Sequence, residues 1–314
     1  MFNGDADGIC ALHQWRLANP VSSTLVTGVK RDIALLQKVQ AGHGDEVVVL
    51  DISLDKNRSG LERLLNEGCN VNYIDHHFSG EVPVHPNLLT TIDTSAATCS
   101  SLLVNRLLDC QYPLWASVGA FGDNLDESAL AVIAHLSLEE DQLELLRNLG
   151  MYLNYNGYGA AISDLVFPPD ELYLKLQPYN SPFDFIASEK VFPKLQECYL
   201  HDMLQAKGVN PALEEPEVAL YILPSKPWAR RVTGVYSNQL VREHPARAHA
   251  ILTVLDGGGY QASVRAPLNN KVGADDLCRE FASGGGRKAA AGINYLPEND
   301  LGLFIERFKS MYRL

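Results

Sequence analysis

An apolar run that stops at one acid and two histidines is the feature that most constrains this chain. The run 71–74 ends in Asp75-His76-His77, and a second apolar run, 47–50, ends in Asp51. In an open parallel sheet, ligands bind outside the carboxyl ends of the strands. We therefore expect these polar side chains to meet at one edge of a parallel sheet.

Two further acidic elements fit the same arrangement. A run of small and apolar residues, 117–122, ends in Asp123, and Asp5-Ala6-Asp7 lies near the first printed residue. Because alternate residues that leave a strand point to opposite sides, Asp5 and Asp7 can each address a different metal ion. Four acidic clusters at one edge repel each other unless cations lie between them. The mixture of carboxylate and imidazole suits Mn, Zn or Fe better than Ca, so the pattern predicts a di-metal hydrolytic site.

Helical and strand patterns alternate up to about residue 165. Strand patterns cover 47–50 and 71–74, and helical patterns cover 32–39, 61–65, 96–109 and 126–149. A helix that stops at Gly68 before a β-branched run is typical of the βαβ units of a doubly wound sheet. We therefore predict an α/β catalytic domain with a doubly wound, mostly parallel sheet over residues 1–190.

A smaller α/β domain is predicted over residues 216–314. Strand patterns at 250–255 and 260–265 flank a glycine-rich turn, which indicates a hairpin. Further strands are predicted at 218–223 and 293–296, and helices at 274–282 and from Asp300 onward. Residues 191–215 are predicted as a connector that is partly helical, with an active cleft between the two domains.

Composition limits the class of protein. A chain of 314 residues with 46% hydrophobic residues suits a globular protein of two domains. No apolar run approaches the roughly 18 residues of a membrane helix, and the first residues lack a signal-peptide pattern. The six cysteines form no Cys-x-x-Cys pair and are expected to be reduced. We expect a cytoplasmic protein with no membrane partner.

Charge limits the partners. The chain has 26 Lys and Arg against 38 Asp and Glu, and its net charge is -12. Proteins that bind long nucleic acids usually carry a basic face, so we expect no long duplex partner. Bound metal ions would make the local electrostatic field positive, so the negative net charge is compatible with a small anionic substrate. A homodimer is also compatible with the pattern, although no particular strand is indicated for it.

A glycine-rich segment, 284–292, is a second candidate binding element. Its glycines let a backbone approach a ligand closely, and their amides are predicted to form an anion-binding loop. Arg287 offers a planar fork for phosphate or a base; the alternative is a flexible loop with solvated basic residues. The candidate substrate-binding residues are Arg265, Gly284, Gly285, Gly286, Arg287 and Lys288.

Together these motifs resemble the DHH phosphoesterase family and its DHH-associated substrate domain. The resemblance covers nearly the whole chain and rests on the ordered set Asp5-x-Asp7, Asp51-x-Ser53, Asp75-His76-His77, Gly122-Asp123 and 284–292. It implies a doubly wound first domain, a mobile smaller domain and a cleft that holds two divalent ions, expected to be manganese.

The resemblance also implies roles for the candidate metal ligands. Asp5 is expected to bind one ion and Asp7 the other, and Asp51 is expected to bridge them. His76 and Asp123 are expected to complete the ligand set of the second ion.

Roles in catalysis and substrate binding follow from the same resemblance. His77 is expected to contact the scissile phosphate, with Asp75 supporting it from outside the metal ligands. Arg265 and Arg287 match positions that hold the other phosphate or the base of the substrate.

The chain departs from the family pattern at three places. Many members carry a His four residues before Asp5, a position that here would precede Met1, so we expect the first ion to bind more weakly or to be completed by water. The strand that leads into Asp5 is also missing from the printed sequence, so we expect the natural start to lie upstream or the chain to be trimmed. Arg287 stands where relatives often have His, which favours a phosphate-bearing end of the substrate.

The expected reaction is two-metal hydrolysis of a phosphodiester. The expected substrate is a dinucleotide such as pGpG or a very short oligonucleotide, cut to nucleoside monophosphates as by a short-oligonucleotide exoribonuclease. Two alternatives stay open. One is a phosphatase that acts on a bisphosphorylated nucleoside or on polyphosphate, and the other is a nucleotide-binding sensor without turnover.

Overall fold

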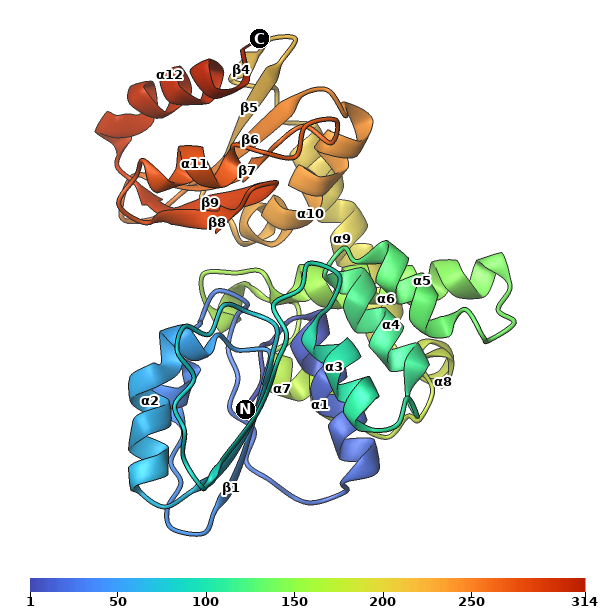
Figure 1. Ribbon diagram of the computed structural model, residues 1–314. Coiled ribbons are helices and arrows are strands. Elements are labelled where there is room, and N and C mark those ends of the chain that lie inside the picture. The colour runs from blue at the N-terminus through green and yellow to red at the C-terminus, as the bar shows by residue number, and fades with distance from the viewer. Residues whose placement is uncertain (314) are drawn as a thin grey trace. The chain divides into compact units, whose positions relative to one another are not determined.

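The computed structural model describes residues 1–313, which divide between Glu197 and Cys198 into two compact units (Figure 1). Each unit has its own sheet and its own apolar core. The boundary lies within helix α9 (Val191–Lys207), which fills part of the predicted connector. None of the described helices is long and apolar enough to cross a membrane.

The first unit is built on a parallel three-stranded sheet. Its strands β1 (Glu46–Leu50), β2 (Asn70–Asp75) and β3 (Leu88–Ile92) lie side by side in that order. In the register, Leu50 pairs with Ile74, so β1 and β2 end at the same edge of the sheet. The expectation that the two apolar runs deliver their acidic ends together is confirmed.

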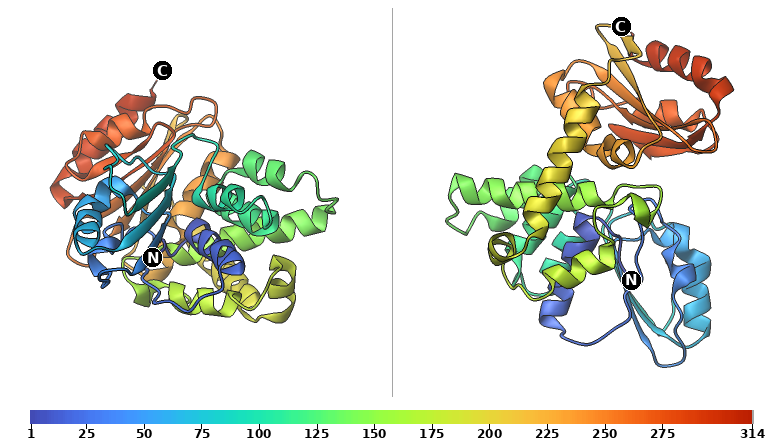
Figure 2. Two further views of the ribbon diagram at one scale, coloured as in Figure 1. Left: turned by 60° about the horizontal axis from the view of Figure 1, so that its bottom comes forward. Right: turned by 180° about the vertical axis from the view of Figure 1, so that it is seen from behind.

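Helices cover both faces of this sheet. Helix α2 (Leu54–Asn66) lies on one face, and α1 (Ala6–Ala18) and α3 (Ser100–Leu107) lie on the other (Figures 1 and 2). The apolar side of α2 packs on β1 and β2, and its buried leucines share a core with Val49 and Tyr73. The doubly wound α/β fold predicted from the sequence is therefore confirmed.

A three-residue segment takes the place of the strand expected before Asp5. Phe2 forms a parallel bridge to Leu50, and the Asn3 amide donates to the Leu50 carbonyl at 3.2 Å. Phe2 is fully buried. Because this segment runs beside β1, Asp5 leaves the sheet at the same edge as Asp51.

The run 117–122 is helical, although the sequence analysis grouped it with the strand-ending runs. It forms the end of α4 (Pro113–Gly122), so Asp123 leaves a helix and not a strand. Small residues serve helix packing here: a Cβ on Gly122 would lie 2.3 Å from the Ala6 Cβ. The small side chains therefore allow α1 and α4 to approach closely.

Two helix predictions in this unit need correction. The predicted helix 32–39 is only a 3-10 turn, η1 (Leu35–Lys38), because the Asn57 side chain binds the backbone of Ile33 and Leu36 and competes with helical bonds. The predicted helix 126–149 is split into α5 (Asp126–Ile133) and α6 (Glu140–Gly157). A capping box between Glu139 and Gln142 starts the second helix. The remaining elements of the unit are η2 (Ile162–Asp164), α7 (Pro169–Leu176) and α8 (Pro182–Ser188).

The second unit is a mixed six-stranded sheet with three helices. The predicted hairpin of β6 (Ala248–Val254) and β7 (Tyr260–Arg265) is confirmed as an antiparallel pair. In spatial order the strands are β4 (Leu213–Glu214), β5 (Val218–Leu223), β6, β7, β9 (Ala290–Leu296) and β8 (Gly284–Arg287). The helices are α10 (Pro227–Glu243), which the sequence analysis did not predict, α11 (Ala274–Arg279) and α12 (Leu301–Tyr312), with the 3-10 turn η3 (Glu298–Asp300) before the last.

The three consecutive glycines lie in an edge strand and not in the predicted loop. Anion binding by their amides stays a prediction. Gly284 to Arg287 pair with β9, and Gly285 lies opposite Gly292. A Cβ on Gly284 would lie 1.6 Å from the Cys278 carbonyl oxygen. The glycine at this position therefore serves the contact between β8 and the end of α11.

Candidate metal site

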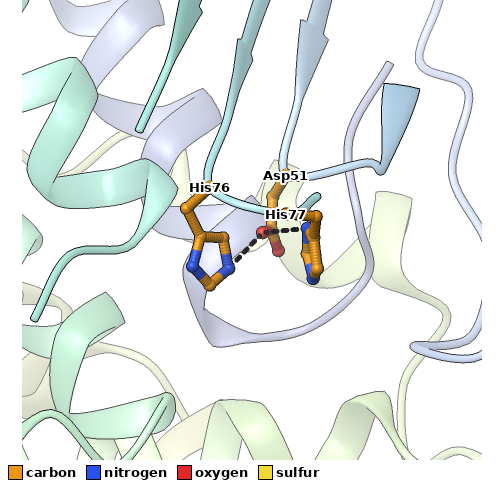
Figure 3. A group of neighbouring side chains, drawn as sticks. All are labelled: Asp51, His76 and His77. Carbon is orange, nitrogen blue, oxygen red and sulfur yellow. Dashed lines mark ion pairs between the residues drawn. The ribbon is translucent and has the colours of Figure 1, made fainter. Parts of the chain in front are cut away.

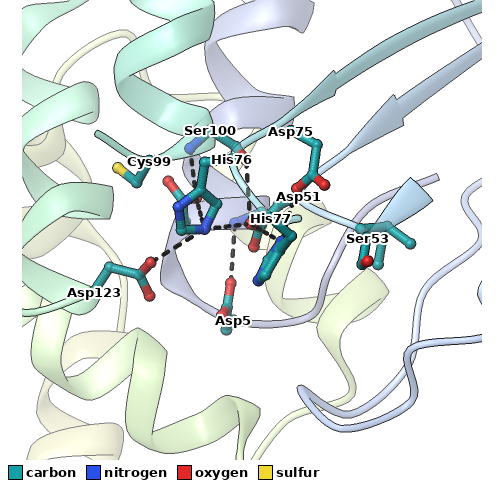
Figure 4. A network of polar contacts seen from close by, with 12 residues as sticks. Asp5, Asp51, Ser53, Asp75, His76, His77, Cys99, Ser100 and Asp123 are labelled. Atoms are coloured by element: carbon teal, nitrogen blue, oxygen red, sulfur yellow. Dashed lines mark hydrogen bonds and ion pairs between the residues drawn. The ribbon is translucent and has the colours of Figure 1, made fainter. Parts of the chain in front are cut away.

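His76 lies at the centre of the site. Its Nδ1 is 3.1 Å from the Thr98 carbonyl oxygen, which can only accept, so Nδ1 carries a hydrogen and Nε2 is the ring nitrogen that can bind a metal ion. Nε2 lies 3.4 Å from Asp51 Oδ1, 3.5 Å from Asp123 Oδ2 and 3.9 Å from Asp7 Oδ2 (Figure 4).

Carboxylates that crowd around one imidazole nitrogen repel each other unless positive charge lies among them. One imidazole nitrogen with several carboxylate oxygens is a ligand set typical of first-row divalent metals. The carbonyl that fixes the ring also fits the partner that metal-bound histidines usually have. The residues present therefore fit a divalent metal ion on the Asp7, Asp51, His76 and Asp123 side chains, which we call the His76 group.

Asp7 is held by the start of a helix. The backbone amides of Ser100 and Ser101, the first residues of α3, donate to its two carboxylate oxygens at 2.7 Å each. The positive end of a helix stabilises a buried anion. Asp7 is fully buried, so this helix end keeps the carboxylate oriented beside His76.

Asp51 has an unusual backbone and an unfavourable electrostatic environment. Its φ is 60°, which is rare for residues other than glycine, and its Oδ1 accepts a hydrogen bond from Ser100 Oγ at 3.1 Å. Burial raises the pKa of the Asp51 carboxyl well above its ordinary value, and the charges of the nearby carboxylates raise it further. Strain of this kind is found at functional sites, and a bound cation would relieve the repulsion.

His77 lies on the open side of the site and is oriented by Asp75. Its Nδ1 is 2.8 Å from Asp75 Oδ1, while Asp51 Oδ1 lies between the two histidines (Figure 3). Burial lowers the pKa of His77, but the hydrogen bond and the charge of Asp75 outweigh burial and raise it overall. The ring is 43% exposed, so His77 is the histidine that solvent and a ligand can reach.

Asp5 faces a different partner. Its Oδ2 is 2.5 Å from Lys30 Nζ, and its Oδ1 accepts the Gly8 amide at 3.0 Å as the N-cap of α1. Lys30 Nζ is also 3.3 Å from Asp123 Oδ1 and 3.0 Å from Asn154 Oδ1. Burial lowers the pKa of Lys30, but the charges of Asp5 and Asp123 outweigh it and raise the pKa well above its ordinary value. Lys30 is therefore an ammonium ion inside the acidic cluster.

A small cavity of about 90 Å³ opens among these groups. The residues that line it include those around His76 and those around Lys30, namely Asn3, Asp5, Lys30, Asp51, His76, His77 and Asp123. Within the described residues, the buried Asn3 Oδ1 has no hydrogen-bond partner. Charged side chains around a small cavity are suited to hydrated or ionic ligands.

Comparisons with solved structures identify the fold. No protein-family model and no curated protein matches the sequence. The exonuclease RecJ bound to manganese is similar over 98% of this chain and 88% of its own, with a TM-score of 0.60 and 16% identity. The pGpG-specific phosphodiesterase PggH from Vibrio cholerae covers 98% of this chain and 99% of its own, with a TM-score of 0.57 and 12% identity. An exopolyphosphatase-related protein from Bacteroides fragilis is similar over 99% of this chain and 89% of its own, with a TM-score of 0.55 and 15% identity.

The chain has the DHH-family fold. Its ordered motifs meet at one site, as the resemblance implied: Asp7, Asp51, His76 and Asp123 converge, and Asp75 and His77 lie beside them. Asp5 reaches the same cavity but is bound to Lys30.

Several residues of the site were not predicted from the sequence. Lys30 stands in the run Val29-Lys30-Arg31-Asp32, which resembles an ordinary surface segment, and Asn154 lies inside a long helix. Thr98 and Ser100 act through a carbonyl and an amide, which no side-chain pattern reveals.

In the second unit, the two predicted arginines lie on one row of the sheet. Arg265 and Arg287 each pair with Ala290 of β9, one from either side. Paired residues of antiparallel strands point to the same face, so both arginines flank a small residue on one face. Arg265 is fixed by Asn238 Oδ1 at 2.8 Å, whereas Arg287 and Lys288 are exposed.

Proposed function

We propose that this protein is a manganese-dependent phosphodiesterase that hydrolyses short linear nucleotides to nucleoside monophosphates. The observation that carries the proposal is that His76 Nε2 faces three carboxylates at the edge of a parallel sheet. Its oxygen and nitrogen donors suit Mn²⁺. The similarity to RecJ bound to manganese and to a pGpG-specific phosphodiesterase supports this choice of ion and reaction.

The residues of the first unit divide into two tasks. The His76 group would hold the ion, which supplies Lewis-acid chemistry by polarising a phosphoryl oxygen and lowering the pKa of water. His77 would contact the scissile phosphate through Nε2, since Nδ1 is bound to Asp75. A positively charged ring stabilises the charge that develops on phosphoryl oxygens, and the raised pKa of His77 favours that form.

The second unit would bind the part of the substrate that does not react. Arg265 and Arg287 present two guanidinium groups on one face, separated by Ala290. Guanidinium binds phosphate through paired hydrogen bonds and stacks on bases. A nucleotide end that carries both a phosphate and a base suits this pair. The net charge of -12 gives a long polyanion no general attraction, so we propose a short substrate.

Incubation with Mn²⁺ and a panel of substrates tests the function. The panel contains pGpG and other 5′-phosphorylated dinucleotides, longer oligomers, bisphosphorylated adenosine and polyphosphate, with products separated by chromatography. His76→Ala is the site variant, and His135→Ala, an exposed histidine of the same unit, is the matched control. We expect mononucleotides from the dinucleotides in the wild type and the control only.

The other products would each contradict the proposal in a recognisable way. Free phosphate from bisphosphorylated adenosine or polyphosphate would indicate a phosphatase. Cleavage of long single strands at physiological salt would refute the short-substrate claim. No product from any substrate, in a protein that binds both Mn²⁺ and nucleotide, would favour the sensor.

A further inference from the structure

Lys30 has a complete set of partners inside the acidic cluster. Its ammonium contacts Asp5 Oδ2, Asn154 Oδ1 and Asp123 Oδ1 at 2.5, 3.0 and 3.3 Å. The Tyr158 ring lies 5.5 Å from Nζ, within cation–π range. An ammonium group has three hydrogens to donate, and three oxygen acceptors surround it. Lys30 is therefore built into the site.

Both carboxylate oxygens of Asp5 already have partners. One of its oxygens accepts the Gly8 amide and the other binds Lys30, and its side chain is 2% exposed. Two groups of described residues bring their ligand atoms within 4.8 Å of one another: Asp51, His76 and His77, and Asp7, His76 and Asp123. Both contain His76, and neither contains Asp5.

Charge explains why a cation stands beside Asp5. Buried carboxylates in one cluster repel each other and require positive charge among them. Lys30 supplies one positive charge at Asp5 and Asp123. A metal ion bound to Asp5 would need the oxygen that Lys30 holds and would stand close to the ammonium, so the two cations exclude each other.

From these contacts we infer that the site binds a single divalent ion, on the His76 group, and that the Lys30 ammonium permanently takes the place of a second ion beside Asp5. This inference rests on the metal-dependent function proposed above. It replaces, for this chain, the prediction from the sequence that the site holds two divalent ions. Asp123 belongs to both sides, with Oδ2 toward His76 and Oδ1 toward Lys30, so the fixed ammonium also orients a metal ligand.

Metal counting tests the inference without an activity assay. The whole chain is equilibrated with excess Mn²⁺, freed of unbound ion by rapid gel filtration, and its manganese per chain is measured by mass spectrometry. The variants are Lys30→Ala, which opens the position, and Lys30→Ser, a second small replacement if the first folds poorly. Lys38→Ala is the matched control, because Lys38 pairs with Asp32 and is 54% exposed.

The expected result is about one Mn²⁺ in the wild type and in Lys38→Ala, and about two in Lys30→Ala or Lys30→Ser, as in two-metal sites. Two ions in the wild type would overturn the inference and leave the proposed function intact. One ion in the wild type and in both Lys30 variants would also overturn it, since Lys30 would not be what excludes the second ion. No bound ion in the wild type would overturn the proposed function together with the inference.

Discussion

Asp5 and Asp7 are two residues apart in the sequence, yet the fold gives them different partners. Asp5 is bound by a lysine and caps α1, whereas Asp7 is held by the amides at the start of α3 and faces His76. The Lys30 side chain neutralises Asp5, whereas Asp7 faces His76 Nε2 at a position that fits a metal ion. The comparison teaches that a motif of two acids does not by itself give the number of ions.

Neutralising Asp7 should have the largest effect. Asp7→Asn removes a charge from the His76 group, and we expect Mn²⁺ affinity to fall by more than about 100-fold, the upper range for changes outside the ligand set. Asp5→Asn leaves that group intact and should lower the affinity by less than about 10-fold. Calorimetric titration with Mn²⁺ measures both. Equal losses in the two variants would break the comparison.

Removing the support of His77 should have the next largest effect. We expect Asp75→Asn to lower kcat by about 10- to 100-fold, with Mn²⁺ binding retained. Asp75 raises the pKa of His77. In Asp75→Asn, the His77 ring should therefore lose its proton at a lower pH than in the wild type, and activity should fall at that lower pH. A pH–rate profile of both proteins shows this shift. An unchanged upper limb would mean that His77 does not act in its charged form.

The second unit offers a contrast that leaves the metal untouched. Arg265→Ala should raise KM for a 5′-phosphorylated dinucleotide by about 10-fold, the loss expected for one charged hydrogen bond, without changing Mn²⁺ affinity. Steady-state kinetics measure this effect. Arg242→Ala, on the exposed side of α10, is the control. A fall in Mn²⁺ affinity in Arg265→Ala would contradict the division of tasks between the units.

The smallest effect concerns stability without metal. The pKa of Asp51 is higher in the folded protein than in the unfolded chain. The charged carboxylate therefore destabilises the fold at pH values above the unfolded pKa, and this loss of stability is relieved as the pH falls through the folded pKa. Asp51→Asn should therefore raise the Tm of the metal-free protein at neutral pH, by roughly 2–4 °C for each kcal/mol relieved. Thermal unfolding in chelator measures this. A lower Tm at neutral pH would mean that Asp51 is stabilised by its hydrogen bonds.

The sequence predicted the elements whose patterns are local. The strands at 47–50 and 71–74 stand out because short apolar runs end sharply in charged residues, and the parallel sheet then brings those ends together. The same logic failed at 117–122, where small residues serve the packing of α4 and not a strand. A separate prediction, that the glycines at 284–286 form a loop, also failed, because they lie in an edge strand.

The partners within the site could not be read in the same way. Lys30 meets residues that are 25, 93 and 124 positions away in the chain, and no pattern in one sequence marks such a contact. The groups that orient His76 and Asp7 are backbone atoms of residues 98 to 101, whose side chains give no signal. Ligand types were therefore predictable, while the balance of charge among them required the fold.

Electron–nuclear double resonance of bound Mn²⁺ tests the central claim most directly, because it detects a nitrogen ligand at the ion itself. The account predicts a ¹⁴N coupling in the wild type that persists in His77→Gln and disappears in His76→Gln. Bound Mn²⁺ without any ¹⁴N coupling in the wild type, or a coupling that survives in His76→Gln, would contradict a metal site centred on His76.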